Sequence, residues 1–230
     1  MIIGLSGLEQ WEKEVFKREF PKDKLIFLPE TISSLMMSRF RNLDGLVVFV
    51  NSKVDKKMLD LLPSLKFVMT MSTGYDHIDV AGCKKRGIVV CSVPSYGENT
   101  VAEHAFALIL ALSRKIVDSV EQTKSGYFGL EGLRGFDLKN KILGVLGTGK
   151  IGKKVVRMGL GFGMKVLLFD AYPDKKFAQE VGCYYVPLEK LLARSDIVSL
   201  HMPYRRETHH FLNRQRIGLM KRGAYVINTA

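Results

Sequence analysis

Residues 142–152 read ILGVLGTGKIG, an apolar run that leads into three glycines at Gly147, Gly149 and Gly152. The helical pattern KKVVRMGL follows directly at residues 153–160. A strand, a glycine-rich turn and a helix in this order are typical of a dinucleotide-binding βα unit. The first glycine would permit the tight turn, the second would let a pyrophosphate approach the backbone, and the third would let helix and strand pack closely.

The start of this helix is a candidate phosphate site. Main-chain amides near Lys150 and Ile151 would face the phosphates, with the positive end of the helix dipole behind them. Glycine-rich turns also serve purely structural purposes, so the glycines alone do not settle the function. The residues that follow them carry the further information.

The next predicted strand, KVLLFD at residues 165–170, ends in Asp170, which lies 18 residues beyond Gly152. This spacing is close to that of the acid that binds the adenosine ribose, although an aspartate can also cap a strand end for structural reasons. A carboxylate accepts hydrogen bonds from ribose hydroxyls and repels a 2′-phosphate, so Asp170 favours NAD over NADP. The nearby Lys175 and Lys176 leave some tolerance of NADP open.

Apolar runs and helical patterns alternate through both halves of the chain, which indicates an α/β fold with two Rossmann-like or flavodoxin-like parallel-sheet domains, the second doubly wound. A mostly apolar helix at residues 99–116 is expected to be largely buried and to join them. We expect a substrate-binding domain at residues 1–97 and an NAD-binding domain at residues 98–230. Strands are predicted at residues 2–5, 24–28, 45–50, 65–71, 88–93, 141–147, 165–170, 183–186, 196–201 and 224–230.

Composition restricts the class of protein. The 230 residues are 47% hydrophobic and 25% charged, without an apolar run of the roughly 20 residues that a membrane span needs and without a leader, so we expect a cytoplasmic protein with no membrane partner. The net charge of +12 is spread over scattered lysine pairs, which favours solvated helix faces over nucleic-acid binding. Three unrelated cysteines and the adjacent His209 and His210 indicate neither disulfides nor a metal site, and we expect the cysteines to be buried.

Several longer motifs extend the glycine fingerprint over nearly the whole chain. They are STGYDHIDV at 72–80, VPSYGENTVAEHAFALILALSR at 93–114, SDIVSLHMP at 195–203 and MKRGAYVINTA at 220–230. With these motifs the sequence resembles the D-isomer-specific 2-hydroxyacid dehydrogenases, most closely the D-lactate dehydrogenase-like branch. The resemblance implies hydride transfer between NAD(H) and a small D-2-hydroxy acid or 2-keto acid, and a homodimer formed through the cofactor domain.

The resemblance also implies roles for individual residues. Backbone amides near Thr73 and Gly74 would hold the substrate carboxylate, with Tyr75 lining the same loop and Tyr96 near the substrate. The remaining positions would border the cofactor: Val101, His201, Met202, Pro203, Thr208, Thr229 and Ala230. For Tyr96, Val101 and His201 an ordinary structural position explains the residue equally well.

The family's catalytic arginine, glutamate and histidine match no position of this sequence, because they would follow Ala230. We therefore assign no catalytic residue within the chain. We expect residues 1–230 to be a fragment or truncated form that is inactive alone. The alternative is a non-catalytic NAD-binding or dimer-forming module derived from such a dehydrogenase.

Overall fold

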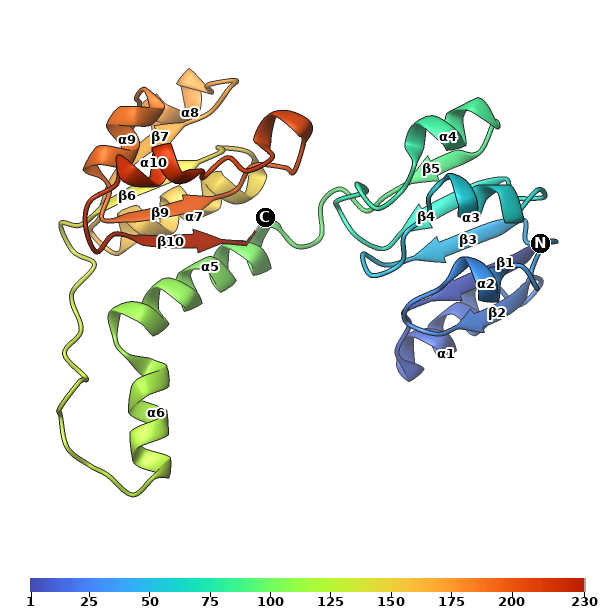
Figure 1. The fold of residues 1–230 in the computed structure, drawn as a ribbon, viewed down its shortest axis with the longest axis horizontal. Coiled ribbons are helices and arrows are strands. Elements are labelled where there is room, and N and C mark those ends of the chain that lie inside the picture. The colour runs from blue at the N-terminus through green and yellow to red at the C-terminus, as the bar shows by residue number, and fades with distance from the viewer. Residues whose placement is uncertain (230) are drawn as a thin grey trace. The chain divides into compact units, whose positions relative to one another are not determined.

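The computed structural model describes residues 1–229, and the chain divides into two compact units, Met1–Tyr96 and Gly97–Ala230. Each unit contains a five-stranded sheet whose paired strands all run parallel (Figure 1). Helices follow most of the strands, as parallel pairing requires of its crossover connections. The predicted α/β fold with two parallel-sheet domains is confirmed.

The first unit has the strand order β2-β1-β3-β4-β5, which is the order of flavodoxin-like sheets. The order reverses between β1 and β3, which makes that pair the topological switch point. The strands are β1 (Ile2–Ser6), β2 (Lys24–Leu28), β3 (Gly45–Val48), β4 (Phe67–Thr70) and β5 (Val89–Cys91), and the helices are α1 (Gln10–Glu19), α2 (Ser34–Met37), α3 (Lys56–Leu61) and α4 (Val80–Lys85).

The second unit has the order β10-β9-β6-β7-β8, a doubly wound sheet that reverses between β6 and β9. Its strands are β6 (Ile142–Leu146), β7 (Lys165–Phe169), β8 (Tyr184–Tyr185), β9 (Ile197–Leu200) and β10 (Tyr225–Asn228). Its helices are α5 (Glu98–Ser113), α6 (Ile116–Lys124), α7 (Lys150–Gly161), α8 (Lys175–Glu180), α9 (Leu188–Arg194), the 3₁₀ helix η1 (Arg206–Thr208) and α10 (Arg214–Gly218).

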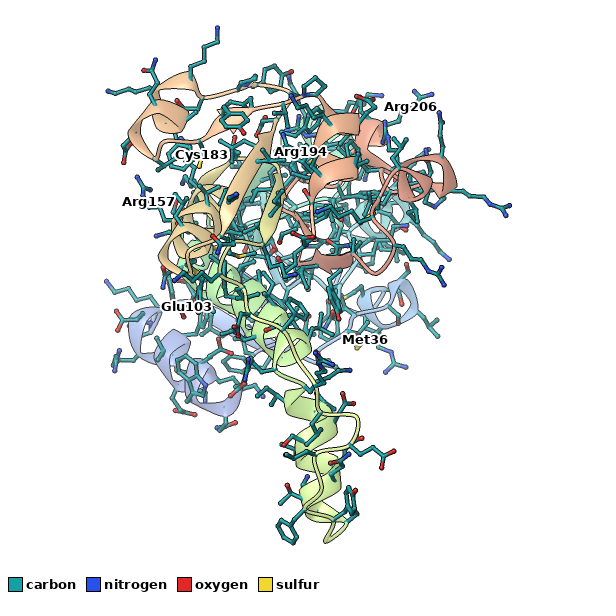
Figure 2. The ribbon with its side chains drawn as sticks, turned by 90° about the vertical axis from the view of Figure 1, so that its left-hand side faces the viewer. Met36, Glu103, Arg157, Cys183, Arg194 and Arg206 are labelled. Carbon is teal, nitrogen blue, oxygen red and sulfur yellow. The ribbon has the colours of Figure 1, made fainter. Side chains whose placement is uncertain are left out.

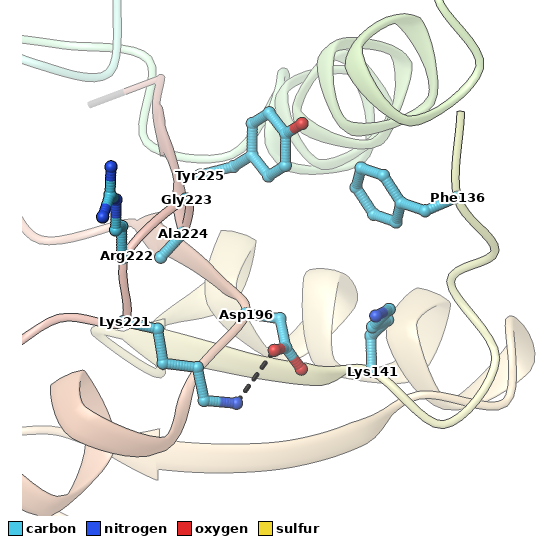
Figure 3. Close-up of a pocket in the computed structure, with 8 residues that line it drawn as sticks. All are labelled: Phe136, Lys141, Asp196, Lys221, Arg222, Gly223, Ala224 and Tyr225. Atoms are coloured by element: carbon cyan, nitrogen blue, oxygen red, sulfur yellow. Dashed lines mark hydrogen bonds and ion pairs between the residues drawn. The ribbon is translucent and has the colours of Figure 1, made fainter. Parts of the chain in front are cut away.

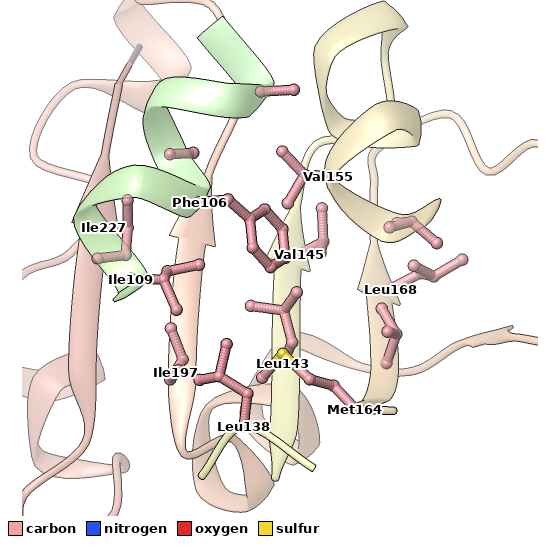
Figure 4. Close-up of a cluster of buried hydrophobic side chains, with 14 of the residues drawn as sticks. Phe106, Ile109, Leu138, Leu143, Val145, Val155, Met164, Leu168, Ile197 and Ile227 are labelled. Atoms are coloured by element: carbon pink, nitrogen blue, oxygen red, sulfur yellow. The ribbon is translucent and has the colours of Figure 1, made fainter. Parts of the chain in front are cut away.

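One face of α5 is part of the core of the second unit. Phe106 and Ile109 of this helix pack in the same buried cluster as Leu143 and Val145 of β6 and Val155 of α7 (Figure 4). Burial of one such side chain contributes about 1.5–3 kcal/mol, so the cluster fixes α5 on the sheet. The helix therefore belongs to the second unit.

The predicted helix at residues 99–116 is wrong in its end and in its burial. The helix ends at Ser113, Lys115 adopts a left-handed φ of 56°, and α6 then begins at Ile116. The carbonyl of Ser113 accepts a hydrogen bond from the Phe136 amide at 2.9 Å, so a distant loop satisfies the helix end. The opposite face of α5 is exposed at positions such as Leu112.

An aspartate joins the amino ends of the strands in the first unit. Asp44, directly before β3, accepts a 2.7 Å hydrogen bond from the amide of Ile2, the first residue of β1. The same carboxylate pairs with Lys66, before β4, at 2.7 Å. These two partners hold the pKa of Asp44 below its ordinary value. The carboxylate thus links the starts of three strands.

The second unit repeats this corner with Asp196, directly before β9. Its carboxylate accepts a hydrogen bond from the Ile142 amide at 2.7 Å. The same carboxylate pairs with Lys221 at 2.8 Å (Figure 3). Burial raises the pKa of Asp196, but these two partners outweigh burial and the pKa lies below its ordinary value. The adjoining hollow of about 320 Å³ is lined by Phe136, Lys141, Asp196, Lys221, Arg222, Gly223, Ala224 and Tyr225. Because Asp44 and Lys66 form the same kind of pair in the first unit, we interpret the Asp196–Lys221 pair as a structural feature of the fold.

Among the described residues, no helix is long and apolar enough to cross a membrane, and no group of three or more His, Cys, Asp or Glu side chains could hold a metal ion. The expectation that the cysteines are buried holds for Cys83, while Cys183 is partly buried. It is wrong for Cys91, which is exposed because β5 is an edge strand of its sheet.

Candidate functional site

The glycine loop, defined as residues 147–152, lies at the carboxyl end of β6, next to the switch point between β6 and β9. Open α/β sheets bind their ligands at this edge. The site can therefore be built from three segments that end here: the loop after β6, Asp170 after β7, and residues 201–203 after β9.

Gly147 brings the end of β9 against the loop. Its φ is +91°, a conformation that side chains rarely adopt, and a Cβ there would stand 2.7 Å from the carbonyl oxygen of His201. The His201 amide donates to the carbonyl of Leu146 at 2.8 Å, which continues the β6–β9 ladder into the loop. Only glycine fits at residue 147 without displacing this neighbour.

Gly152 and Gly149 show opposite surroundings. A Cβ at Gly152 would lie 2.0 Å from the carbonyl oxygen of Gly147, so the first turn of α7 packs directly on the loop backbone. A Cβ at Gly149 would meet nothing within 4 Å. Gly149 is the N-cap of α7, and no side chain caps the helix there. The backbone next to Gly149 is thus open to a phosphate, as the sequence pattern predicts.

The start of α5 lies beside the start of α7. Glu98 and Lys150 form an ion pair at 3.2 Å, which joins the first turns of the two helices. The predicted cofactor residue Val101 lies one turn further along α5 and is partly buried. Ile151, in the first turn of α7, is also partly buried and packs against the core.

Asp170 is bound into the glycine loop. Its Oδ2 accepts hydrogen bonds from the Thr148 amide at 2.6 Å and the Thr148 hydroxyl at 3.0 Å. Its Oδ1 accepts from the Tyr172 amide at 2.9 Å. A carboxylate has about four lone-pair sites, so these contacts leave one on Oδ1. The structure therefore brings together the glycine loop, which indicates a dinucleotide site, and Asp170, which favours NAD.

Sequence reasoning missed two residues of this site. Thr148 is 4% exposed, and its hydroxyl lies 2.7 Å from the hydroxyl of Tyr185 in β8. The Tyr185 oxygen also accepts from the amide of Asp174 at 3.0 Å. Thr148 is one of the variable positions of the fingerprint and Tyr185 lies 37 residues away, so no spacing rule pointed to them.

Ion pairs hold α8 against α7 beside the ribose acid. Lys153 pairs with Asp174 at 2.5 Å. Arg157, which is labelled in Figure 2, pairs with Glu180 at the same distance. The bonds from Lys153 and from the Phe177 amide keep the pKa of Asp174 below its ordinary value. In the structure the Lys153 ammonium group is therefore already paired with Asp174 of the same unit.

His201 is largely buried, and burial lowers its pKa to about 4. Its Nε2 lies 2.7 Å from the Ser199 hydroxyl. At neutral pH the imidazole is therefore uncharged. The next residue, Met202, reaches to 2.9 Å from the position of a Cβ on Gly147, so its side chain also lies against the glycine loop.

Thr208 closes the loop that follows Pro203. Its hydroxyl donates to the Pro203 carbonyl at 2.8 Å, and the Arg205 amide donates to that hydroxyl at 2.7 Å. The hydroxyl is thus already used in holding the loop, and its role toward a cofactor stays a prediction. Thr229 follows β10, and its buried Oγ1 has no hydrogen-bond partner among the described residues. Ala230 lies outside the described residues.

In the first unit, the predicted carboxylate-binding turn follows β4. The Ser72 hydroxyl donates to the Gly74 carbonyl at 2.7 Å, and the Thr73 hydroxyl donates to the Val93 carbonyl at 3.0 Å. Both hydroxyls are used within the fold, so what the turn offers to a ligand is its backbone. A Cβ on Gly74 would meet only Asp76 Oδ1, at 3.4 Å.

A hollow of about 300 Å³ lies beside this turn. Its lining residues are Tyr75, Val80, Val90, Cys91 and Ser92. Tyr75 is 53% exposed, and Tyr96, at the end of the first unit, is 59% exposed. This exposure excludes a half-buried position in the core of the first unit, which was the structural alternative for Tyr96. Contact of either ring with a substrate stays a prediction.

Known proteins match the chain over almost its whole length. A family model described as the NAD-binding domain of the D-isomer-specific 2-hydroxyacid dehydrogenases matches residues 106–230. A glyoxylate reductase of Korarchaeum cryptofilum is 35% identical over 99% of this chain and 67% of its own length. A D-lactate dehydrogenase of Escherichia coli is 38% identical over 100% of this chain and 71% of its own length.

Among solved structures, the D-lactate dehydrogenase of Aquifex aeolicus, in complex with NAD and lactic acid, superposes with a TM-score of 0.91. It is 37% identical, and the match covers 100% of this chain and 69% of that one. The present chain spans about two thirds of the length of the curated relatives. NAD as the cofactor, predicted from the sequence, is confirmed.

Proposed function

The chain belongs to the D-isomer-specific 2-hydroxyacid dehydrogenase family, and on that premise we propose that it serves the NAD-dependent interconversion of a small D-2-hydroxy acid and its 2-keto acid. The observation that carries the proposal is the meeting of an open glycine loop with an anchored Asp170 at the carboxyl edge of a doubly wound sheet. When bound, NADH supplies the hydride that reduces the keto carbon.

The residues of the second unit hold the cofactor in this proposal. The amides at the start of α7 receive the pyrophosphate beside Gly149, where a side chain is absent and the helix dipole favours an anion. The remaining lone pair of Asp170 Oδ1 receives a hydroxyl of the adenosine ribose. Residues 201–203 border the cofactor from the end of β9.

The turn at Thr73 and Gly74 holds the substrate carboxylate through its backbone, because successive amides of a turn form a small anion-binding concavity. The hollow lined by Tyr75 and Val80 then takes the carbon chain of a small acid. His201 is not proposed as the proton donor for the reduction, because burial holds its pKa at about 4 and its imidazole is therefore almost entirely in the neutral form at neutral pH.

The exposed apolar arm, defined as residues 116–130, supports a second copy of the chain as partner. Val117 is 60% exposed, Phe128 is 82% exposed and Leu130 is 85% exposed, and α6 contains no buried residue. Several large exposed apolar side chains in one segment are typical of an interaction surface. We therefore assign the arm to a homodimer interface.

The molar mass in solution, measured by light scattering, tests this assignment. The protein is compared with a Val117→Lys/Val120→Lys variant, which we expect to have a lower mass, and with Glu121→Lys as control. Equal masses for all three proteins would contradict the assignment.

A Gly149→Val variant tests the cofactor site. A Cβ at residue 149 meets nothing within 4 Å, so we expect the thermal unfolding midpoint to stay close to that of the parent, while the added methyl groups occupy the space proposed for the pyrophosphate. We expect NADH affinity, measured by fluorescence titration, to fall at least about 10-fold. Gly161→Ala, in the same helix but with nothing within 4 Å, is the control. An unchanged NADH affinity in Gly149→Val would contradict the proposal.

A Gly74→Val variant tests the substrate site. The substitution is made in the full-length natural protein that contains these residues. NADH oxidation is followed with pyruvate, glyoxylate, phenylpyruvate and 2-ketoisocaproate. We expect the KM for the keto acid to rise while NADH affinity is unchanged, since the two sites lie in different units. A KM unchanged for every acid would remove the turn from the site. NADH binding without turnover of any acid would favour a non-catalytic module.

A further inference from the structure

We propose that Tyr185 and Thr148 are positioning residues for the ribose acid: a directed hydrogen-bond chain from β8 through the glycine loop fixes which oxygen of Asp170 remains available to the cofactor. The inference rests on the proposed function, because it concerns how that same site selects its nucleotide.

The direction of the chain follows from its two ends. The Asp170 carboxylate can only accept, so the single proton of the Thr148 hydroxyl points to Oδ2. The Thr148 oxygen must then accept from the Tyr185 hydroxyl, 2.7 Å away. At the other end the main-chain amide of Asp174 can only donate, and it donates to the Tyr185 oxygen. Every proton in the chain is thus directed toward Asp170.

The chain decides how much bonding capacity Asp170 keeps. The amide and the hydroxyl of Thr148 occupy both lone-pair sites of Oδ2, and the Tyr172 amide occupies one site of Oδ1. One site on Oδ1 remains. The carboxylate is therefore held with a single acceptor available for a ribose hydroxyl, and it offers no donor to a 2′-phosphate.

The position of Thr148 makes this arrangement rigid. The residue is 4% exposed, between Gly147 and Gly149, so its side chain cannot turn to solvent. Tyr185 lies on the outer strand of the sheet, and its hydroxyl also ties in the residue that caps α8. Loss of the Thr148 hydroxyl removes one of the two bonds that hold Oδ2, and loss of the Tyr185 hydroxyl removes the donor that orients the Thr148 hydroxyl.

The test uses Thr148→Val and Tyr185→Phe, which remove one hydroxyl each with little change of shape. Thr148→Ser keeps the hydroxyl and is the rescue variant. Tyr184→Phe removes the hydroxyl of the neighbouring, 56% exposed tyrosine and is the matched control. For each variant, NADH and NADPH affinities are measured by fluorescence titration, together with the thermal unfolding midpoint. The same changes are then made in an Asp170→Ala background.

We expect Thr148→Val to weaken NADH binding about 3- to 10-fold and Tyr185→Phe about 2- to 5-fold, which is the range of one hydrogen bond to a charged group or its support. We expect Thr148→Val and Tyr185→Phe to reduce the ratio of NADH affinity to NADPH affinity. Thr148→Ser and Tyr184→Phe leave this ratio unchanged. In the Asp170→Ala background the two changes have no further effect on NADH affinity, because the group they position is gone.

A purely structural role would lower the unfolding midpoint and leave the NADH:NADPH ratio unchanged, and this result would overturn the inference. Equal losses of NADH affinity with and without Asp170 would overturn it as well. If Asp170→Ala itself leaves NADH affinity unchanged, the ribose assignment of the proposed function fails. If Asp170→Ala weakens binding but Thr148→Val and Tyr185→Phe do not, only the positioning inference fails.

Discussion

The carbonyl oxygen of Gly147 lies against the Cα of Gly152 so closely that a Cβ on residue 152 would stand 2.0 Å from it. The contact joins the strand end to the first turn of α7, and the obstacle is backbone that cannot rotate away. Among Gly147, Gly149 and Gly152, residue 152 leaves the least space for a Cβ, so a side chain there is expected to reduce stability most.

Gly152→Ala is therefore expected to lower the free energy of unfolding by about 1–3 kcal/mol, as overpacking of a buried site does. It also weakens NADH binding, because the loop must shift. Urea denaturation and NADH titration measure the two effects.

Gly161→Ala is the control for helix propensity in the same helix. A Cβ there meets nothing within 4 Å, so alanine is neutral or stabilises by up to about 1 kcal/mol. Equal stability of the two variants would mean that the Gly147–Gly152 contact is loose in solution.

His201 predicts a pH dependence of stability. Its pKa is about 4 in the folded protein and 6.5 in the unfolded chain, so the unfolded state binds the proton more readily. The contribution of the neutral imidazole is fully present above about pH 6.5 and is lost as the pH falls toward 4. The difference corresponds to about 3 kcal/mol.

Urea unfolding of the parent and of His201→Asn, from pH 7.5 to pH 4.5, measures this contribution. The parent loses stability more steeply than the variant across that range. His77, whose pKa is also lowered by burial, contributes in the same direction to both proteins. Parallel curves would show that His201 is solvated in solution.

Asp196→Ala removes the acceptor for the Ile142 amide and the partner of Lys221. We expect a loss of about 1–3 kcal/mol in the free energy of unfolding, because a main-chain donor at the start of β6 loses its bond. Asp137→Ala removes an 86% exposed carboxylate paired with Arg114 and is expected to change stability by less than about 0.5 kcal/mol. Similar losses for the two would contradict the structural role of the corner.

The fold could be predicted because its signals are local. The strand at residues 142–146, the three glycines and the acid at 170 are contiguous features whose spacing is set by one βα unit and the strand after it. The helix break at Lys115 could not be predicted in the same way, since the bond that satisfies its end comes from Phe136, far along the chain.

The site was predicted where a residue type has few alternatives and missed where it has many. Glycines at 147 and 152 are required by backbone contact, so their pattern is informative. A threonine and a tyrosine occur in every kind of structure, and only the pairing of β7 with β8 brings Tyr185 to Thr148. Cys91 was misjudged because exposure of an edge strand depends on sheet order, which residue type does not reveal.

The most direct test of the account is a titration of the protein and of Asp170→Ser with NADH and with NADPH under identical salt. The account predicts that the parent prefers NADH, and that the variant binds NADH about 5- to 30-fold more weakly while its discrimination against NADPH shrinks, because a charged acceptor is lost and a repulsion is removed. Equal affinities of parent and variant for NADH, with an unchanged preference, would contradict it.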